Sequence, residues 1–153
     1  MAKILKIYNF QDPILRVKCR DIEYIDKWVL DLTSDMWLTM LMSKAFGLAA
    51  NQVGYDYNII SIDGPDFKGP MINPVIVEKS NDVFHFSEGC LSMPGFAVNT
   101  GRRSKNIKVN YLDLTGKQET VTLENKTAVI VQHEIDHLRG LIMTDHLNEE
   151  MLK

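Results

Sequence analysis

Apolar residues recur at helical spacing between residues 22 and 42. The positions that fit this spacing are Ile25, Trp28, Val29, Leu32, Met36 and Met40. Because an α-helix turns once every ~3.6 residues, these side chains fall on one stripe of its surface. The pattern predicts one long amphipathic helix from about Asp26 to Met42, with its methionines and tryptophans in the core.

A stretch rich in β-branched and aromatic residues follows this helix. Strands are predicted at residues 58–62, 72–78, 83–88, 107–112 and 118–123. Glycine and proline residues predict a loop over 64–70, and residues 113–116 predict a hairpin turn. A second helix is predicted from near Asn125, ended by Gly140 in the left-handed conformation. The order helix, strands, helix favours the α+β class over alternating α/β.

The composition is that of a globular protein with no strong affinity for polyanions. The chain has 153 residues and a net charge of −3, so we expect one domain over residues 1–153 and no nucleic-acid partner. The start of the chain is too polar for a signal peptide, and no apolar run reaches the ~18 residues of a membrane span. Two cysteines, Cys19 and Cys90, fit a reducing compartment. We therefore expect a cytoplasmic protein without membrane spans.

Candidate metal ligands lie on the second predicted helix, in the sequence QHEIDH at residues 132–137. His133 and His137 are one helical turn apart, so both imidazoles can bind the same ion. Glu134 can act as the general base that takes a proton from a water molecule on the metal. Cys90, in the sequence EGCLS, can supply a third ligand and leave a fourth position open.

Each of these residues has a simpler explanation when taken alone. A solvated helix face with ion pairs can contain HExxH by chance, and Cys90 can be a core thiol. The second helix is strongly apolar, however, so its histidines and Glu134 are expected inside the protein, where unpaired charges are costly. The sequence GLAANQVG at residues 47–54 adds small residues and the amide of Gln52, which is a surface amide or a donor to a developing oxyanion. The case for a metal site depends on the three segments together.

A zinc protease is the main alternative among enzymes with HExxH. One class continues as HExxHxxGxxH, and here Gly140 fits but Met143 stands in the last position. Another class takes its third ligand from a glutamate well downstream, whereas Glu149 and Glu150 follow the motif too closely. A structural metal site is the other alternative, but such sites usually have four protein ligands, and no fourth is evident.

Three motifs in this order, GLAANQ, EGCLS and QHEIDH, resemble the signature motifs of the peptide deformylase family. QDPILR at residues 11–16 resembles its opening segment, and the likeness extends from residue 4 to residue 147. The resemblance implies an α+β fold with antiparallel β-sheets surrounding a central metal-binding helix. It also implies hydrolysis of the N-formyl group, as formate, from the N-terminal formylmethionine of newly synthesised polypeptides.

The resemblance also implies roles for individual residues. Glu134 would be the general acid/base, and Gln52 and the backbone N–H of Leu91 would stabilise the oxyanion. One divalent metal ion would be bound, Fe²⁺ first, with Ni²⁺, Co²⁺ or Zn²⁺ as replacements. Its ligands would be Cys90, His133 and His137.

An apolar pocket for the methionine side chain should adjoin the motifs. Its expected walls are Phe46, Phe86, Val129 and Ile130. Plain core packing explains each of these four residues equally well. The substrate backbone is expected to pair with the extended segment around Phe46 and Gly47, as an added strand would. Gly89 allows a close approach of the backbone beside the cysteine.

Supporting contacts around the ligands are also expected. Asp136 should pair with Arg102 or Arg103, either to steady the helix or as a surface ion pair. Glu88 should brace the loop that presents the cysteine. His146 has the pattern of an ordinary histidine, with nothing to place it at the metal.

Two features depart from the family pattern. The glycine motif usually begins with a further glycine at the position of Ala45, so the extra methyl can restrict φ or narrow the substrate's approach; we expect retained activity. Many bacterial members carry a C-terminal helix, linked in some to ribosome docking, whereas this chain stops at Lys153. It resembles the short forms encoded by some phages, for which the compartment would be the host cytoplasm. We expect a monomer that acts on nascent chains with at most transient ribosome contact.

Overall fold

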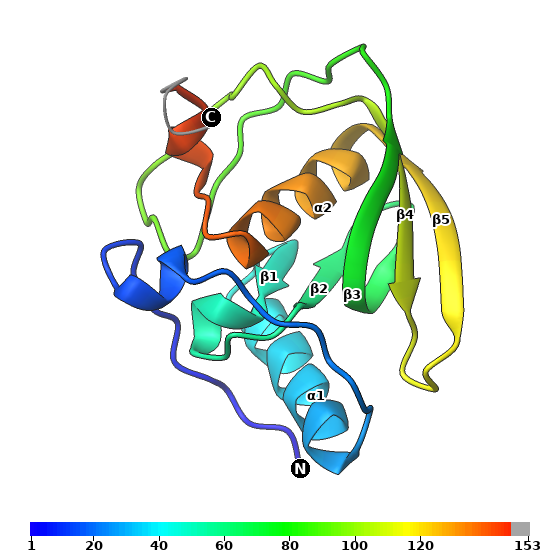
Figure 1. The fold of residues 1–153 in the computed structure, drawn as a ribbon. Coiled ribbons are helices and arrows are strands. Elements are labelled where there is room, and N and C mark those ends of the chain that lie inside the picture. Colours follow the sequence, from blue (N-terminus) through cyan, green and yellow to red (C-terminus); the bar gives the residue numbers. More distant parts are fainter. Residues whose placement is uncertain (148–153) are drawn as a thin grey trace.

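The computed structural model describes residues 1–147 (Figure 1). The expectations for the C-terminal tail, including Glu149 and Glu150, lie outside these residues. The helical elements are η1 (Pro13–Arg16), α1 (Lys27–Met42), η2 (Ala50–Val53), α2 (Asn125–Leu138) and η3 (Met143–Leu147). The strands are β1 (Gly47–Ala49), β2 (Ile59–Asp63), β3 (Lys68–Lys79), β4 (Asn106–Leu112) and β5 (Gln118–Glu124).

All five strands form one antiparallel sheet in the order β1-β2-β3-β4-β5. Each strand therefore pairs with its neighbour in the sequence, and the connections between paired strands are short except for the one between β3 and β4. One sheet, rather than several, accounts for the strands of residues 1–147, and the architecture is α+β as predicted. The strand β1 lies at an edge and pairs with β2 alone, through partners such as Leu48 and Ser61.

The helix α1 covers one end of the sheet with its apolar stripe. It begins after Asp26, whose carboxylate accepts a hydrogen bond from Val29 N at 3.4 Å. The stripe packs into one core with side chains of β1, β2 and β3; its buried apolar members are Val29, Leu32, Met36 and Met40. Trp28, expected in the core, is instead 40% exposed and packs against the ring of Tyr57, because it lies beside the stripe rather than on it.

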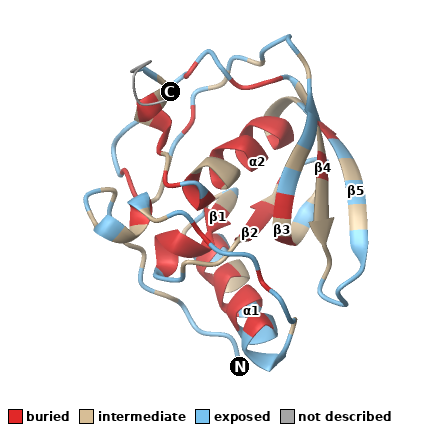
Figure 2. Cartoon of the chain, viewed as in Figure 1, coloured by how far each residue is buried: buried red, intermediate tan, exposed pale blue. Residues whose placement is uncertain are grey.

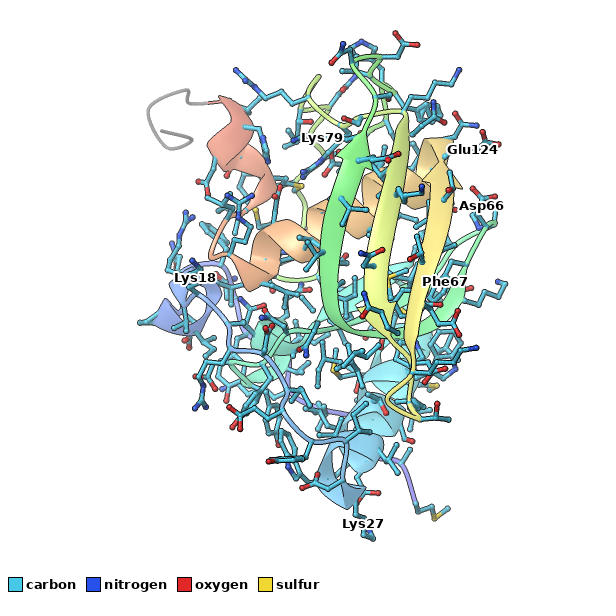
Figure 3. All side chains as sticks on the ribbon, turned by 45° about the vertical axis from the view of Figure 1, so that its right-hand side comes forward. Lys18, Lys27, Asp66, Phe67, Lys79 and Glu124 are labelled. Atoms are coloured by element: carbon cyan, nitrogen blue, oxygen red, sulfur yellow. The ribbon has the colours of Figure 1, made fainter. Side chains whose placement is uncertain are left out.

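The helix α2 lies across the concave side of the sheet, and most of its residues are buried (Figure 2). Ala128, Val131 and Leu138 pack with apolar residues of β2 to β5, which makes α2 the centre of the second core. The opposite faces of β3, β4 and β5 carry side chains that point away from α2 (Figure 3). Gly140 has a φ of +79° and donates its N–H to His137 O, which confirms it as the left-handed residue that closes the helix.

The segment between β3 and β4 does not contain the strand predicted over residues 83–88. It makes only isolated bridges, from Val83 to Ser104 and from Glu88 to Val98. The β-rich composition was misleading because this segment leaves the sheet and passes around α2 (Figure 1), where no continuous strand lies beside it. No helix among residues 1–147 combines the length and hydropathy that crossing a membrane requires.

Candidate active site

Three candidate ligand atoms converge beside the middle of α2. His133 and His137 are both buried, and their Nε2 atoms are 3.1 Å apart. Cys90 Sγ comes from the segment between β3 and β4 and lies 3.4 Å from His137 Nε2. The three ligand atoms lie within 4.8 Å of one another. The predicted ligand set is therefore brought together from two distant parts of the chain.

The residues present fit a divalent metal ion. Two nitrogens ~2.1 Å from a tetrahedral ion would be separated by ~3.4 Å, close to the spacing of the two imidazoles. Burial lowers the pKa of His133, but the charge of Glu134 and the contacts with Cys90 and Glu88 raise that pKa to about 10. The same negative surroundings that favour a proton on this imidazole would favour a dication. Burial and the charge of His133 lower the pKa of His137, which keeps its imidazole neutral and able to bind a metal.

A buried charge network orients the first of these imidazoles. Glu88 Oε1 accepts a hydrogen bond from His133 Nδ1 at 2.9 Å, which directs Nε2 toward the other ligands. Arg103, only 4% exposed, donates to both carboxylate oxygens of Glu88 at 2.9 and 3.0 Å and to Asp136 at 2.5 Å. Glu88 therefore orients a candidate ligand histidine in addition to joining its loop to Arg103. Of the two arginines expected as partners of Asp136, Arg103 is the one that forms the ion pair.

His146 completes this network, although its sequence context gave no sign of a role. Its Nε2 lies 2.6 Å from Asp136 Oδ2 and 3.3 Å from Arg103 Nη1. Burial raises the pKa of Asp136, but the hydrogen bonds and charges of His146 and Arg103 lower that pKa to about 2. Since His146 belongs to η3, it ties the segment after α2 to the helix itself.

Glu134 lines the same cavity as Cys90 and His133. The side chain is buried and its Oε1 atom has no hydrogen-bond partner within residues 1–147. Burial raises the pKa of Glu134 to about 7, although the positive charge of His133 opposes this shift. A carboxylate with a pKa near neutrality can both accept and return a proton. Gly47 makes room for it, because a Cβ at this position would lie 2.5 Å from Glu134 Oε2.

The turn η2 fixes the amide of Gln52 next to the same atoms. Ala49 N donates to Gln52 Oε1 at 2.9 Å, so the amide turns its Nε2 toward Ser92 Oγ at 3.2 Å and Cys90 Sγ at 3.6 Å. The neighbouring Asn51 donates to His137 O at 2.6 Å and so joins η2 to the end of α2. Ser92 and Asn51 were not singled out from the sequence, although both lie inside the motifs.

A cavity of about 410 Å³ opens onto these groups. The cavity is lined by all the residues predicted to contact substrate, namely Phe46, Gly47, Phe86, Gly89, Val129 and Ile130. Leu91 lines it as well. Val129 is buried, whereas Phe46 is 51% exposed and therefore marks the mouth of the cavity. Ala45 also lines the cavity, and the sequence did not indicate five other lining residues, which are Lys44, Ser87, Met93, Gly95 and Phe96. The backbone at Ala45 does not have a positive φ, so its methyl group causes no backbone strain.

The comparison with known proteins agrees with this arrangement. The family model described as polypeptide deformylase matches residues 4–153. The chain belongs to the polypeptide deformylase family. It is 40% identical, over 98% of this chain and 97% of the other, to a peptide deformylase of Dictyoglomus thermophilum.

Solved deformylase structures share the fold as well. The class I type b peptide deformylase of Acinetobacter baumannii has a TM-score of 0.90 and 31% identity, with 94% of this chain and 99% of the other covered. A second structure of that enzyme, with Met-Ala-Ser bound, has a TM-score of 0.87 and 29% identity, covering 95% and 99%. Polypeptide deformylases are enzymes that depend on a metal ion, and the cysteine and two histidines of this member form a group that can hold one.

Proposed function

We propose that this deformylase family member removes the N-formyl group from the N-terminal formylmethionine of new polypeptides and releases formate. The observation that carries the proposal is the placement of Glu134. Its buried carboxylate lines the same cavity as Cys90 and His133, two of the three residues whose ligand atoms converge. The relative from A. baumannii with Met-Ala-Ser bound supports a peptide that begins with methionine as the product.

Cys90, His133 and His137 would hold one divalent ion, which we propose is Fe²⁺, with Ni²⁺, Co²⁺ or Zn²⁺ as replacements. When bound, such an ion polarises the formyl oxygen and makes water acidic enough to be a nucleophile near pH 7. Three protein ligands leave a position open for water and substrate, as catalytic sites require. A thiolate ligand suits iron or zinc better than magnesium or calcium.

Glu134 would move the proton. It accepts a proton from the attacking water as the water oxygen bonds to the formyl carbon. It then donates that proton to the methionine nitrogen as the C–N bond breaks, so that the peptide leaves as an amine and the formyl group as formate. The pKa of about 7, raised by burial, suits both transfers.

Gln52 and the backbone N–H of Leu91 would donate hydrogen bonds to the oxygen of the formyl group. That oxygen gains negative charge during attack, and one donor to such an oxyanion is typically worth ~10²–10³ in rate. Gln52 supports this role because Ala49 N already holds its carbonyl oxygen, so the amide cannot turn its NH₂ group away without losing that bond.

The cavity would select methionine through Phe86, Val129 and Ile130, which enclose an unbranched apolar side chain. The substrate backbone would lie along the outer edge of β1, at Phe46 and Gly47, with Gly89 on the other side. Support comes from the edge position of β1 and from the contact between Gly47 and Glu134. We further propose that residues 1–153 act as one monomeric domain on nascent chains in the cytoplasm, with transient ribosome contact.

The test begins with protein purified without oxygen and analysed for metal. Formate release is measured from formyl-Met-Ala-Ser, with acetyl-Met-Ala-Ser as control. We expect turnover of the formyl peptide only, and a loss of at least ~10²-fold in kcat for Glu134→Ala with the metal retained. Bound metal without turnover, even after reloading with iron, nickel or cobalt, would contradict the proposal.

A further inference from the structure

Two lysines place positive charge at the mouth of the cavity. Lys44 is exposed and lines the cavity directly. Lys126 Nζ lies 3.7 Å from the centre of the Phe46 ring and 5.9 Å from that of Phe86, and both rings line the same cavity. The cation–π contact holds the ammonium group over the mouth and leaves N–H donors directed away from the rings.

No carboxylate of residues 1–147 forms an ion pair with either lysine. Asp63, whose N–H donates to Phe46 O, has its carboxylate bonded to Lys68 at 2.5 Å. Lys126 also lies in the first turn of α2, where the helix dipole adds to the positive potential. The two lysines therefore bring positive charge to the exposed part of the cavity lining, whereas the acidic residues that line it, Glu88 and Glu134, are buried.

The path of the substrate leads past these two lysines. Glu134 packs closely against Gly47, the first residue of β1, so the reacting formyl group would lie beside Gly47 and the peptide would continue past Phe46 toward Lys44. An extended peptide advances ~3.3 Å per residue, and Lys44 stands three positions before Gly47 in the sequence. The side chains that reach the mouth would then be those of the second and third residues of the peptide.

We propose that Lys44 and Lys126 make this site selective for formylmethionyl peptides with an acidic side chain at the second or third residue. The inference depends on the proposed deformylase function and adds a preference beyond methionine. Charge at the mouth would also raise the rate of encounter with acidic chains, an effect that salt weakens.

The test compares the hydrolysis of matched, C-terminally amidated peptides, in which the side chain is the only added charge. Formyl-Met-Asp-Ser and formyl-Met-Ala-Asp are each compared with the corresponding asparagine peptide, which has the same shape without the charge. We expect kcat/KM to favour aspartate by ~3- to 10-fold at low ionic strength, since an exposed ion pair is typically worth ~0.2–1 kcal/mol and two lysines contribute. The preference should shrink toward unity in ~0.5 M salt.

Two substitutions assign the preference to these residues. Lys126→Met keeps most of the stem over the rings, and Lys44→Asn removes charge at a φ of 56° that asparagine tolerates well. The double variant should lose the aspartate preference, whereas Lys117→Met, in the β4–β5 hairpin turn, should keep it. Equal kcat/KM for both peptides in the unmodified protein, or a preference that persists in the double variant or in high salt, would overturn the inference. Turnover of formyl-Met-Ala-Ser tests the deformylase function separately.

Discussion

Gly47 allows the backbone of β1 to pack closely against Glu134, the proposed proton-transfer group. A Cβ on Gly47 would lie 2.5 Å from Glu134 Oε2 and 2.8 Å from Ile130 Cγ2, so both side chains would have to move. Real Cβ atoms essentially never approach other atoms so closely. The glycine is required here for space rather than for an unusual φ, because its φ is not positive.

We therefore expect Gly47→Ala to lower kcat by ~10²-fold or more, because a displacement of about 1 Å at a catalytic group can have an effect of that size. The measurement is formate release, together with the thermal midpoint. Gly64→Ala is the matched control, since its Cβ would meet Thr127 Oγ1 at 2.8 Å outside the cavity. It should lower stability with little effect on kcat. Equal losses of kcat in both variants would mean that Gly47 acts through stability alone.

Residue chemistry predicted the centre of the site better than its surroundings. Cys90, His133 and His137 were found because thiolate and imidazole at motif spacing have few other uses, and the structure brings them together. The sequence could not decide between Arg102 and Arg103, since adjacent residues of a loop point in directions that only the fold sets. The lysine over Phe46 was missed for the same reason, because nothing local indicates a contact between residues 80 positions apart.

At the level of elements, the end of α2 depends on one residue that meets two demands. Gly140 has a φ of +79°, and a Cβ there would lie 2.7 Å from Arg16 O. Gly116, in the hairpin turn, has a similar φ of +83°, but its Cβ would meet nothing closer than 4.0 Å. A side chain at Gly116 would therefore cause backbone strain alone, whereas a side chain at Gly140 would cause both backbone strain and steric overlap.

Gly116→Ala should lower the free energy of unfolding by ~1–2 kcal/mol, the usual strain of a left-handed residue with a side chain. Gly140→Ala should cost at least ~1 kcal/mol more, because the overlap with Arg16 adds to that strain. Urea denaturation of both variants gives the comparison. Equal losses would show that the backbone near Arg16 relaxes at no cost.

Elements with strong local patterns were predicted well, and elements made by distant partners were not. Four of the five strands coincide with predicted strands to within a few residues, because they are rich in the β-branched and aromatic residues on which the prediction relied. The segment over residues 83–88 has the same composition but only isolated bridges, since a strand needs a continuous neighbour. An extended segment was expected around Phe46 and Gly47, but β1 was not among the predicted strands because glycine and alanine have low β-propensity.

In the molecule as a whole, the candidate site is assembled from segments far apart in the sequence. The motifs meet because α2 crosses the sheet, while the segment after β3 wraps around it (Figure 1). The ligand atoms therefore converge only in the folded chain, and an ion bound there would stabilise that state over the unfolded one.

Chelation of the metal-loaded protein should lower its thermal midpoint. An ion present at ~100 times its Kd contributes ~2.7 kcal/mol, and ~1 kcal/mol shifts the midpoint of a domain of this size by ~2–4 °C. We expect a loss of roughly 5–10 °C in calorimetry, restored by adding the ion back. A Cys90→Ala/His137→Ala variant should not respond to the chelator. A midpoint that ignores the chelator in the unmodified protein would contradict a site coupled to folding.

Arg103 holds two carboxylates that belong to different parts of the chain, Glu88 on the wrapping segment and Asp136 on α2. The flat, forked guanidinium gives Glu88 two hydrogen bonds, from Nε and Nη2, and gives Asp136 a third from Nη1, whereas the compact ammonium of a lysine cannot reproduce the paired bonds to Glu88. The two basic residue types are thus not equivalent at this position. Substitution of Arg103 by lysine would therefore change the orientation of the His133 imidazole indirectly, through Glu88.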